Sequence, residues 1–189
     1  RCSEDGPTGA LDEFGVLDAN KCLAWLLQAK GIFPRAYRVA LGDRLYGCDD
    51  CQVLCPINDS ALNVSQASPG AESHVDILKL LDSPDEELME KFGHWYIPRR
   101  QPSYLRRNAL VVLGNSGNRD DPAIDRVLSE CLNSDEALVR SHAVWAALRL
   151  DKKHLVTEQH PTSLLRDDPE GIVFAELQEW GISMDGDVG

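Results

Sequence analysis

The chain has 189 residues, of which 43% are hydrophobic and 26% are charged, a balance typical of soluble globular proteins. No apolar run approaches the roughly 18 to 20 residues of a membrane-spanning helix, and none opens the chain like a signal peptide. The sequence therefore predicts a cytoplasmic protein with no membrane contact, and its net charge of −12 excludes nucleic-acid contacts over the whole surface.

The first ten residues contain an incomplete cysteine motif. Cys2 is followed after three residues by G-P-T-G-A, where a ferredoxin would have C-P-T-G-A, so Gly6 stands at the position of a cysteine. The chain also begins at Arg1 rather than at methionine. We therefore expect a piece of a longer protein whose upstream domain is missing.

The next predicted element is a short helix from Cys22 to Gln28, which reads C-L-A-W-L-L-Q. Trp25 is expected to pack in this apolar setting. Cysteines are concentrated in the same part of the chain, with five among the first 55 residues: Cys2, Cys22, Cys48, Cys51 and Cys55. The sixth, Cys131, stands alone in a helical stretch and is expected to be a small buried residue.

The most informative cysteines form the pattern C-x2-C-x3-C-P from Cys48 to Pro56. The two-residue spacing brings two thiolates to one iron–sulfur cluster, and the last cysteine, before proline, serves a different cluster in two-cluster ferredoxins. Two alternatives stay open. Disulfides would suit a secreted protein, although five clustered cysteines is an odd number. Structural zinc would need a second knuckle, and His74 and His94 lie too far along the chain to supply one.

Residues 1–150 resemble the epoxyqueuosine reductase family. The resemblance rests most strongly on residues 42–52, which read G-D-R-L-Y-G-C-D-D-C-Q, a block that generic ferredoxins lack. Residues 17–22 (L-D-A-N-K-C) are similar to the family's bridge to an isolated cysteine, and residues 105–109 resemble its L-R-R-N-A stretch.

The resemblance implies an oxidoreductase that reduces epoxyqueuosine to queuosine at the wobble position of tRNA. The cobalamin and the catalytic acid would belong to the missing upstream domain, and no catalytic residue is expected in this chain. Two 4Fe–4S clusters would carry electrons from an external donor such as a flavodoxin or a ferredoxin. The corrin would face Ala24 in the helix that begins at Cys22 and the separate turn at Asp49 and Asp50, although both aspartates could equally be solvated turn residues.

The resemblance also divides the cysteines between the clusters. The first cluster would take Cys2 and Cys55, together with two cysteines from the missing upstream part. The second would take Cys22, Cys48 and Cys51. Gly6 occupies the position of its fourth ligand and cannot donate a thiolate, which leaves this cluster three-ligated, open to an outside ligand, or absent.

Residues 59–73, rich in Ser, Asn, Ala and Gly, predict a linker. The pattern is then helical throughout. Apolar residues at 75–81 predict one helix, Ser83, Pro84 and the acids after them predict the start of the next, and residues 122–132 predict an amphipathic helix.

Two of the helical stretches align at an offset of 34 residues: L-R-R-N-A-L at 105–110 and V-R-S-H-A-V at 139–144. This period predicts HEAT-like repeats over residues 74–165. Residues 166–189 predict an acidic helix and tail. The expected fold is thus mainly α and monomeric, with an incomplete ferredoxin-like two-cluster module at residues 1–58 ahead of the repeats.

Residues 91–119 contain no Asp or Glu but six basic residues: Lys91, Arg99, Arg100, Arg106, Arg107 and Arg119. Two of them fall at the start of a predicted helix, where unpaired backbone N–H groups favour phosphate. Together with the resemblance, this predicts that Arg99, Arg100, Arg106 and Arg107 contact the tRNA backbone. Ion pairs with acidic segments elsewhere in the chain are the alternative.

The leading hypothesis is therefore the electron-transfer and tRNA-binding portion of an epoxyqueuosine reductase, inactive by itself. The alternative is a generic 4Fe–4S electron carrier fused to a protein-binding helical repeat. A third hypothesis is a repeat scaffold with a structural zinc site.

Overall fold

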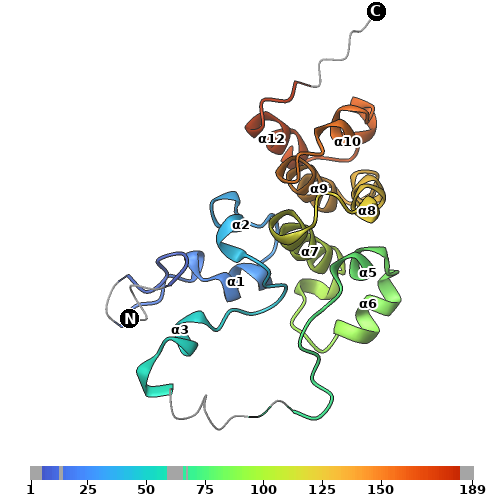
Figure 1. Cartoon of the computed structure of the whole chain (residues 1–189). Coiled ribbons are helices and arrows are strands. Elements are labelled where there is room, and N and C mark those ends of the chain that lie inside the picture. Colours follow the sequence, from blue (N-terminus) through green and yellow to red (C-terminus); the bar gives the residue numbers. More distant parts are fainter. Residues whose placement is uncertain (1–5, 13–14, 59–65, 67, 184–189) are drawn as a thin grey trace, which may run out of the picture.

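Every regular element that the computed structural model describes is a helix, and it describes residues 6–12, 15–58, 66 and 68–183 (Figure 1). The cysteine segment, residues 6–58, contains only short helices: η1 Ala19–Lys21, α1 Leu23–Gln28, α2 Arg35–Leu41, α3 Asp50–Val53 and η2 Pro56–Asn58. The helical segment, residues 74–183, contains α5 Ile77–Asp82, α6 Asp85–Phe92, η3 Pro98–Arg100, α7 Ser103–Ser116, α8 Pro122–Leu132, α9 Ala137–Arg149, α10 Lys153–Thr157, α11 Pro161–Leu164 and α12 Ile172–Glu179. The predicted mainly helical fold is confirmed. Over the described ranges, no helix has the length and apolar character needed to cross a membrane.

Aspartates placed before the helices set several of their first turns. The side chain of Asp76 accepts a hydrogen bond from the amide of Lys79 at the start of α5, and Asp121 does the same for Ala123 at the start of α8. Capping of this kind satisfies backbone N–H groups that have no partner within the helix. The predicted helices at 75–81, 83–92 and 122–132 are confirmed within one or two residues.

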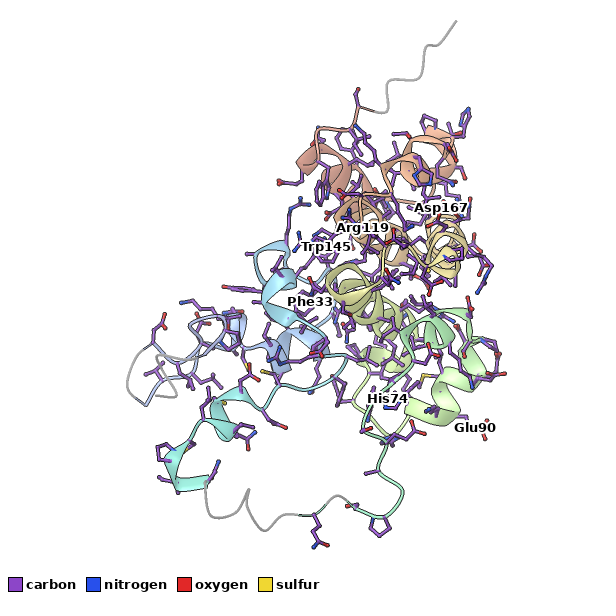
Figure 2. The ribbon with its side chains drawn as sticks, in the orientation of Figure 1. Phe33, His74, Glu90, Arg119, Trp145 and Asp167 are labelled. Carbon is purple, nitrogen blue, oxygen red and sulfur yellow. The ribbon has the colours of Figure 1, made fainter. Side chains whose placement is uncertain are left out.

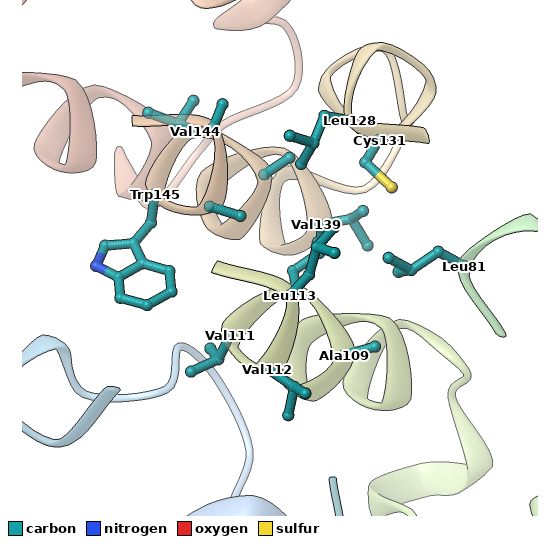
Figure 3. Packing of buried hydrophobic residues seen from close by; sticks show 14 of the residues in the cluster. Leu81, Ala109, Val111, Val112, Leu113, Leu128, Cys131, Val139, Val144 and Trp145 are labelled. Carbon is teal, nitrogen blue, oxygen red and sulfur yellow. The ribbon is translucent and has the colours of Figure 1, made fainter. Parts of the chain in front are cut away.

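Helices α7 and α9, which carry the two stretches that align at an offset of 34 residues, form the centre of the core. Residues 109–113 of α7 and 143–148 of α9 are all buried, as expected of helices that are apolar on nearly every side. Figure 3 shows the two helices packed together, with Leu128 of α8 and Leu81 of α5 completing the cluster. The pair of aligned stretches is thus a pair of interior helices.

Close contact between α7 and α9 depends on a glycine. A Cβ atom at Gly114 of α7 would lie 2.4 Å from Cζ3 of Trp145, so no larger residue fits there without a shift of the indole. Cys131 is also part of this core, as expected, and burial raises the pKa of its thiol to about 12.

The cysteine segment shares this core rather than forming one of its own. Leu23, Leu27, Phe33 and Leu41 are buried in the same hydrophobic cluster as α7 and α9. Phe33, labelled together with Trp145 of α9 in Figure 2, lies on the side of the cysteine segment that meets the helical segment. The change in composition after residue 58 therefore does not separate two hydrophobic cores, because the cysteine segment and the helical segment share one.

The C-terminal helix α12 also holds the cysteine segment in place. Glu176 of α12 is buried and pairs with Arg35 and with Arg38 of α2, the latter at 2.8 Å between Nη1 and Oε2. His142 of α9 makes a further link, because its Nε2 accepts the amide hydrogen of Phe33 at 3.1 Å. The helix expected within residues 166–189 is thus present as α12, which lies against α9 and α2.

Candidate functional site

Three of the predicted cluster ligands line one cavity, although they come from separate parts of the chain. Cys22 precedes α1, Cys48 precedes α3, and Cys51 lies within α3. The segment that begins at Gly6 closes the remaining side. The lining residues are Gly6, Pro7, Thr8, Ala10, Leu11, Leu17, Cys22, Leu23, Cys48 and Cys51. Gly6 therefore lines the same cavity as the three cysteines.

Hydrogen bonds hold the N-terminal side of the cavity against the start of α1. The hydroxyl of Thr8 donates to the carbonyl oxygen of Lys21, the residue before Cys22. The amide of Asp18 donates to the carbonyl of Ala10 at 2.9 Å. These bonds connect the G-P-T-G-A sequence to the residues just before Cys22, so Thr8 helps to hold this side of the cavity in place.

An ion pair fixes the turn that carries Cys48 and Cys51. Nη2 of Arg44 donates to both carboxylate oxygens of Asp50, at 2.9 and 2.8 Å. Gly47 has a φ of 77°, a left-handed conformation that favours glycine. Burial raises the pKa of the Cys48 thiol, so a metal that binds this sulfur has to displace a proton.

The same sequence block is anchored to the helical segment through an aromatic contact. The ring of Tyr46 stacks on that of Trp95, with 4.5 Å between centroids and 11° between planes. Its hydroxyl oxygen accepts a hydrogen bond from the amide of Tyr96 at 2.8 Å. The arginine, tyrosine and second glycine of the block at residues 42–52 thus all position the loop that leads to the cysteines.

The donor set around the cavity fits an iron–sulfur cluster, because its three candidate ligands are all cysteines and thiolates are the usual ligands of 4Fe–4S clusters. Among the described residues, no group of three His, Cys, Asp or Glu side chains is placed to hold a single metal ion. Cys55 follows α3 and is not among the described residues that line the cavity, and Cys2 lies outside the described residues.

Comparison with known proteins agrees with this geometry. Residues 1–58 match the model of the 4Fe–4S double cluster binding domain. The chain is 36% identical over 161 residues to an uncharacterized protein in the gldA 3′ region of Geobacillus stearothermophilus, covering 83% of this chain and 73% of that protein. It is 37% identical over 151 residues to epoxyqueuosine reductase of Bacillus subtilis, covering 77% of this chain and 38% of that enzyme. The chain is therefore similar in sequence to epoxyqueuosine reductases and contains a segment like a double 4Fe–4S cluster domain.

Solved structures of epoxyqueuosine reductases share the fold of this chain. The chain superimposes on epoxyqueuosine reductase bound to an epoxyqueuosine-modified tRNA-Tyr stem loop with a TM-score of 0.73 and 30% identity, covering 94% of this chain and 47% of that one. For the Bacillus subtilis enzyme the TM-score is 0.72 at 29% identity, covering 94% and 48%. The chain thus spans less than half of these epoxyqueuosine reductases.

The residues that the family resemblance assigns to the corrin differ in how accessible they are. Asp49 is exposed and accepts a hydrogen bond from Nε2 of Gln52 at 2.8 Å, whereas Asp50 is occupied by Arg44. Ala24 is half-buried. Trp25 beside it is 55% exposed and is not part of the hydrophobic core, so its expected packing beside the clusters stays a prediction. The apolar face of α1 is formed by its leucines.

The four arginines of this chain that were predicted to contact tRNA differ in their exposure and in their partners. Arg99 and Arg100 are exposed in η3, both with positive φ, and Arg100 donates to the carbonyl of Gly93 at 3.1 Å. Arg106 instead forms an ion pair with Asp85 and donates to the carbonyl of Ser83 at 2.8 Å. The alternative of pairing with distant acids therefore holds for Arg106.

Arg107 is fully buried, and the prediction that it contacts tRNA is wrong. Its guanidinium donates to backbone carbonyls of the cysteine segment that lie 76 to 81 residues away in the sequence. Because residues 91–119 contain no Asp or Glu, the sequence suggested that the Arg107 charge was unpaired. Its partners are instead backbone carbonyl oxygens. Asn108 is also buried and also contacts this segment. The sequence signal that could have identified it is a polar residue at a core position of the L-R-R-N-A-L stretch.

Proposed function

We propose that this chain is the electron-transfer and tRNA-binding portion of an epoxyqueuosine reductase, which reduces epoxyqueuosine to queuosine at the tRNA wobble position in the cytoplasm. The cavity shared by Cys22, Cys48 and Cys51 carries this proposal, because it lies within the segment that matches a double 4Fe–4S domain. The named activity of relatives at 30–37% identity supports the oxidoreductase assignment.

In this proposal Cys22, Cys48 and Cys51 ligate the second cluster, and Cys2 and Cys55 ligate the first together with ligands from outside this chain. A bound cluster supplies electrons one at a time. The protein's part is to fix the thiolates: Thr8 holds the approach to Cys22, and Arg44 holds the turn at Cys48. Since Gly6 offers no thiolate, the second cluster has three protein ligands and an exchangeable fourth.

The remaining assignments follow from the same proposal. Residues 1–58 form a ferredoxin-like module, 59–73 a linker, 74–165 HEAT-like repeats and 166–189 an acidic end. Cobalamin, held mainly by another part of the enzyme, faces Ala24 and the turn at Asp49 and Asp50. The enzyme works as a monomer with a flavodoxin or ferredoxin as donor.

In this proposal the main tRNA contacts are Arg99 and Arg100 in η3. Arg99 and Arg100 are solvent-facing and lie in the stretch that lacks acids. A relative solved with a tRNA stem loop supports an RNA-binding role. Arg106 contributes only if tRNA displaces its bond to Asp85.

Anaerobic reconstitution with iron and sulfide tests the proposed cofactor. We expect brown protein with up to about four iron and four sulfide per chain, because only the second cluster has most of its ligands here. Zinc should be substoichiometric. Colourless protein with one tightly bound zinc per chain would contradict the proposal.

One observation favours the alternative of an electron carrier with a protein-binding repeat. Of the four predicted tRNA contacts, Arg107 is buried against backbone carbonyls and Arg106 is paired with Asp85, on a chain of net charge −12. The dependence of tRNA affinity on salt separates the two functions, because phosphate contacts release counterions and protein contacts do not do so to the same extent.

A further inference from the structure

The helix that begins at Cys22 is too short to define its own position. Helix α1 contains only six residues, and isolated helices of that length are not stable in water. Its last carbonyl groups also have no partner within the helix. Side chains from α7, far along the sequence, supply the missing donors.

Arg107 provides most of these hydrogen bonds. Its Nη2 donates to the carbonyls of Leu26 and Leu27 at 3.2 and 2.8 Å, and its Nη1 donates to those of Ala29 and Gly31, both at 2.7 Å. The carbonyl end of a helix carries partial negative charge, so a cation is favourable there. The guanidinium therefore caps α1 through two of its own carbonyl groups and two of the carbonyl groups just after it.

Asn108 connects the same cap to the second ligand-bearing stretch. Its Oδ1 accepts from Nε and Nη2 of Arg107 at 3.0 and 2.8 Å, which orients the guanidinium. Its Nδ2 donates to the carbonyl of Leu27 at 3.1 Å and is within 3.4 Å of the carbonyl of Leu45, three residues before Cys48. Both side chains are buried, with Arg107 at 0% and Asn108 at 2% exposure.

We propose that Arg107 and Asn108 are positioning residues for the second cluster, because together they hold the helix that begins at Cys22 and the stretch that leads to Cys48 at a fixed separation. This inference rests on the proposed iron–sulfur function. The two residues touch no cluster and act through the backbone. Their role matters more here than in a four-cysteine site, because Gly6 leaves three thiolates to hold the cluster and none of them can be misplaced without loss.

The chain contains a matched control for Arg107. Arg140 of α9 is also fully buried and also donates to backbone carbonyls, those of Ser134, Asp135, Leu164 and Arg166. All of these acceptors lie within the helical segment, away from Cys22, Cys48 and Cys51. Replacing either arginine by methionine removes a buried cation with several hydrogen bonds, but only Arg107 contacts the ligand-bearing stretches.

The test compares reconstituted wild type, Arg107→Met and Arg140→Met. Both variants should lower the melting temperature. Only Arg107→Met should accelerate loss of the visible absorbance to an iron chelator, by roughly 10-fold to 100-fold, the usual effect of removing a residue that supports a metal ligand. Equal rates of cluster loss in the two variants would overturn the proposal. Should Arg107→Met not fold, Asn108→Ala replaces it in the same comparison.

Hydrogen exchange on the cluster-free protein tests the positioning without the cofactor. Arg107→Met should raise exchange at the amides of residues 26–31, and Arg140→Met should leave them as in wild type. Unchanged exchange in Arg107→Met would overturn the positioning role even where the cluster forms normally. Wild type that takes up no iron would instead overturn the proposed function, and with it any cluster for Arg107 to support.

Discussion

The cysteine segment and the helical segment bury their side chains to very different extents. Helices α7 and α9 lie inside a continuous core, whereas Val16, Leu17, Val53 and Ile57 of the cysteine segment are more than half exposed. Few apolar contacts mean low local stability. The helical segment can thus hold its shape by packing, while the ends of the cysteine segment depend on ligation and on side chains from α7 and α9. A metal site of this kind couples folding to metal binding.

The largest expected effect is on the free energy of unfolding and comes from a substitution in the buried core of the helical segment. Leu110→Ala in α7, at a fully buried position, should lower the free energy of unfolding by about 2 to 5 kcal/mol because it leaves a cavity. Ile57→Ala, at an 86% exposed position, should change it by less than about 0.5 kcal/mol. Denaturant unfolding measures both. Similar losses in the two variants would remove the distinction between the segments.

The next effect concerns ligation on the cysteine side. Gly6→Cys should raise the iron content and slow cluster loss in air, because Gly6 lines the cavity with Cys22, Cys48 and Cys51 and a thiolate there replaces an exchangeable ligand. Iron and sulfide assays over an air-exposure series measure this effect. An unchanged content and rate would mean that residue 6 does not face the cluster.

The smallest expected effect concerns the exposed arginines of the helical segment. Arg99→Gln together with Arg100→Gln should make the slope of log affinity for tRNA against log salt shallower by about two units, one for each lost phosphate contact. Arg119→Gln is the control, since Arg119 lies in the same basic stretch but pairs with Asp151. Parallel slopes for all three proteins would favour the protein-binding alternative.

Sequence predictions were accurate where the interactions are local in the chain, and inaccurate where the partners lie far apart in the sequence. Helices α6 and α8 were predictable because Pro84, Pro122 and the nearby acids are local signals. The cysteine spacing likewise predicted a group that the fold brings to one cavity. Arg107 was misjudged because its partners are backbone carbonyls, which every residue has and which leave no trace in the sequence. The exposure of Trp25 could not be predicted because a short apolar helix does not show which of its faces is covered.

The iron content of cysteine variants tests the central claim most directly. The account predicts that Cys22→Ser, Cys48→Ser and Cys51→Ser combined abolish iron uptake on anaerobic reconstitution. Cys55→Ser should retain most of the iron, since Cys55 is not among the described residues that line the cavity. Wild-type iron and sulfide in the triple variant, or their complete loss in Cys55→Ser, would contradict the assignment of Cys22, Cys48 and Cys51 to one cluster.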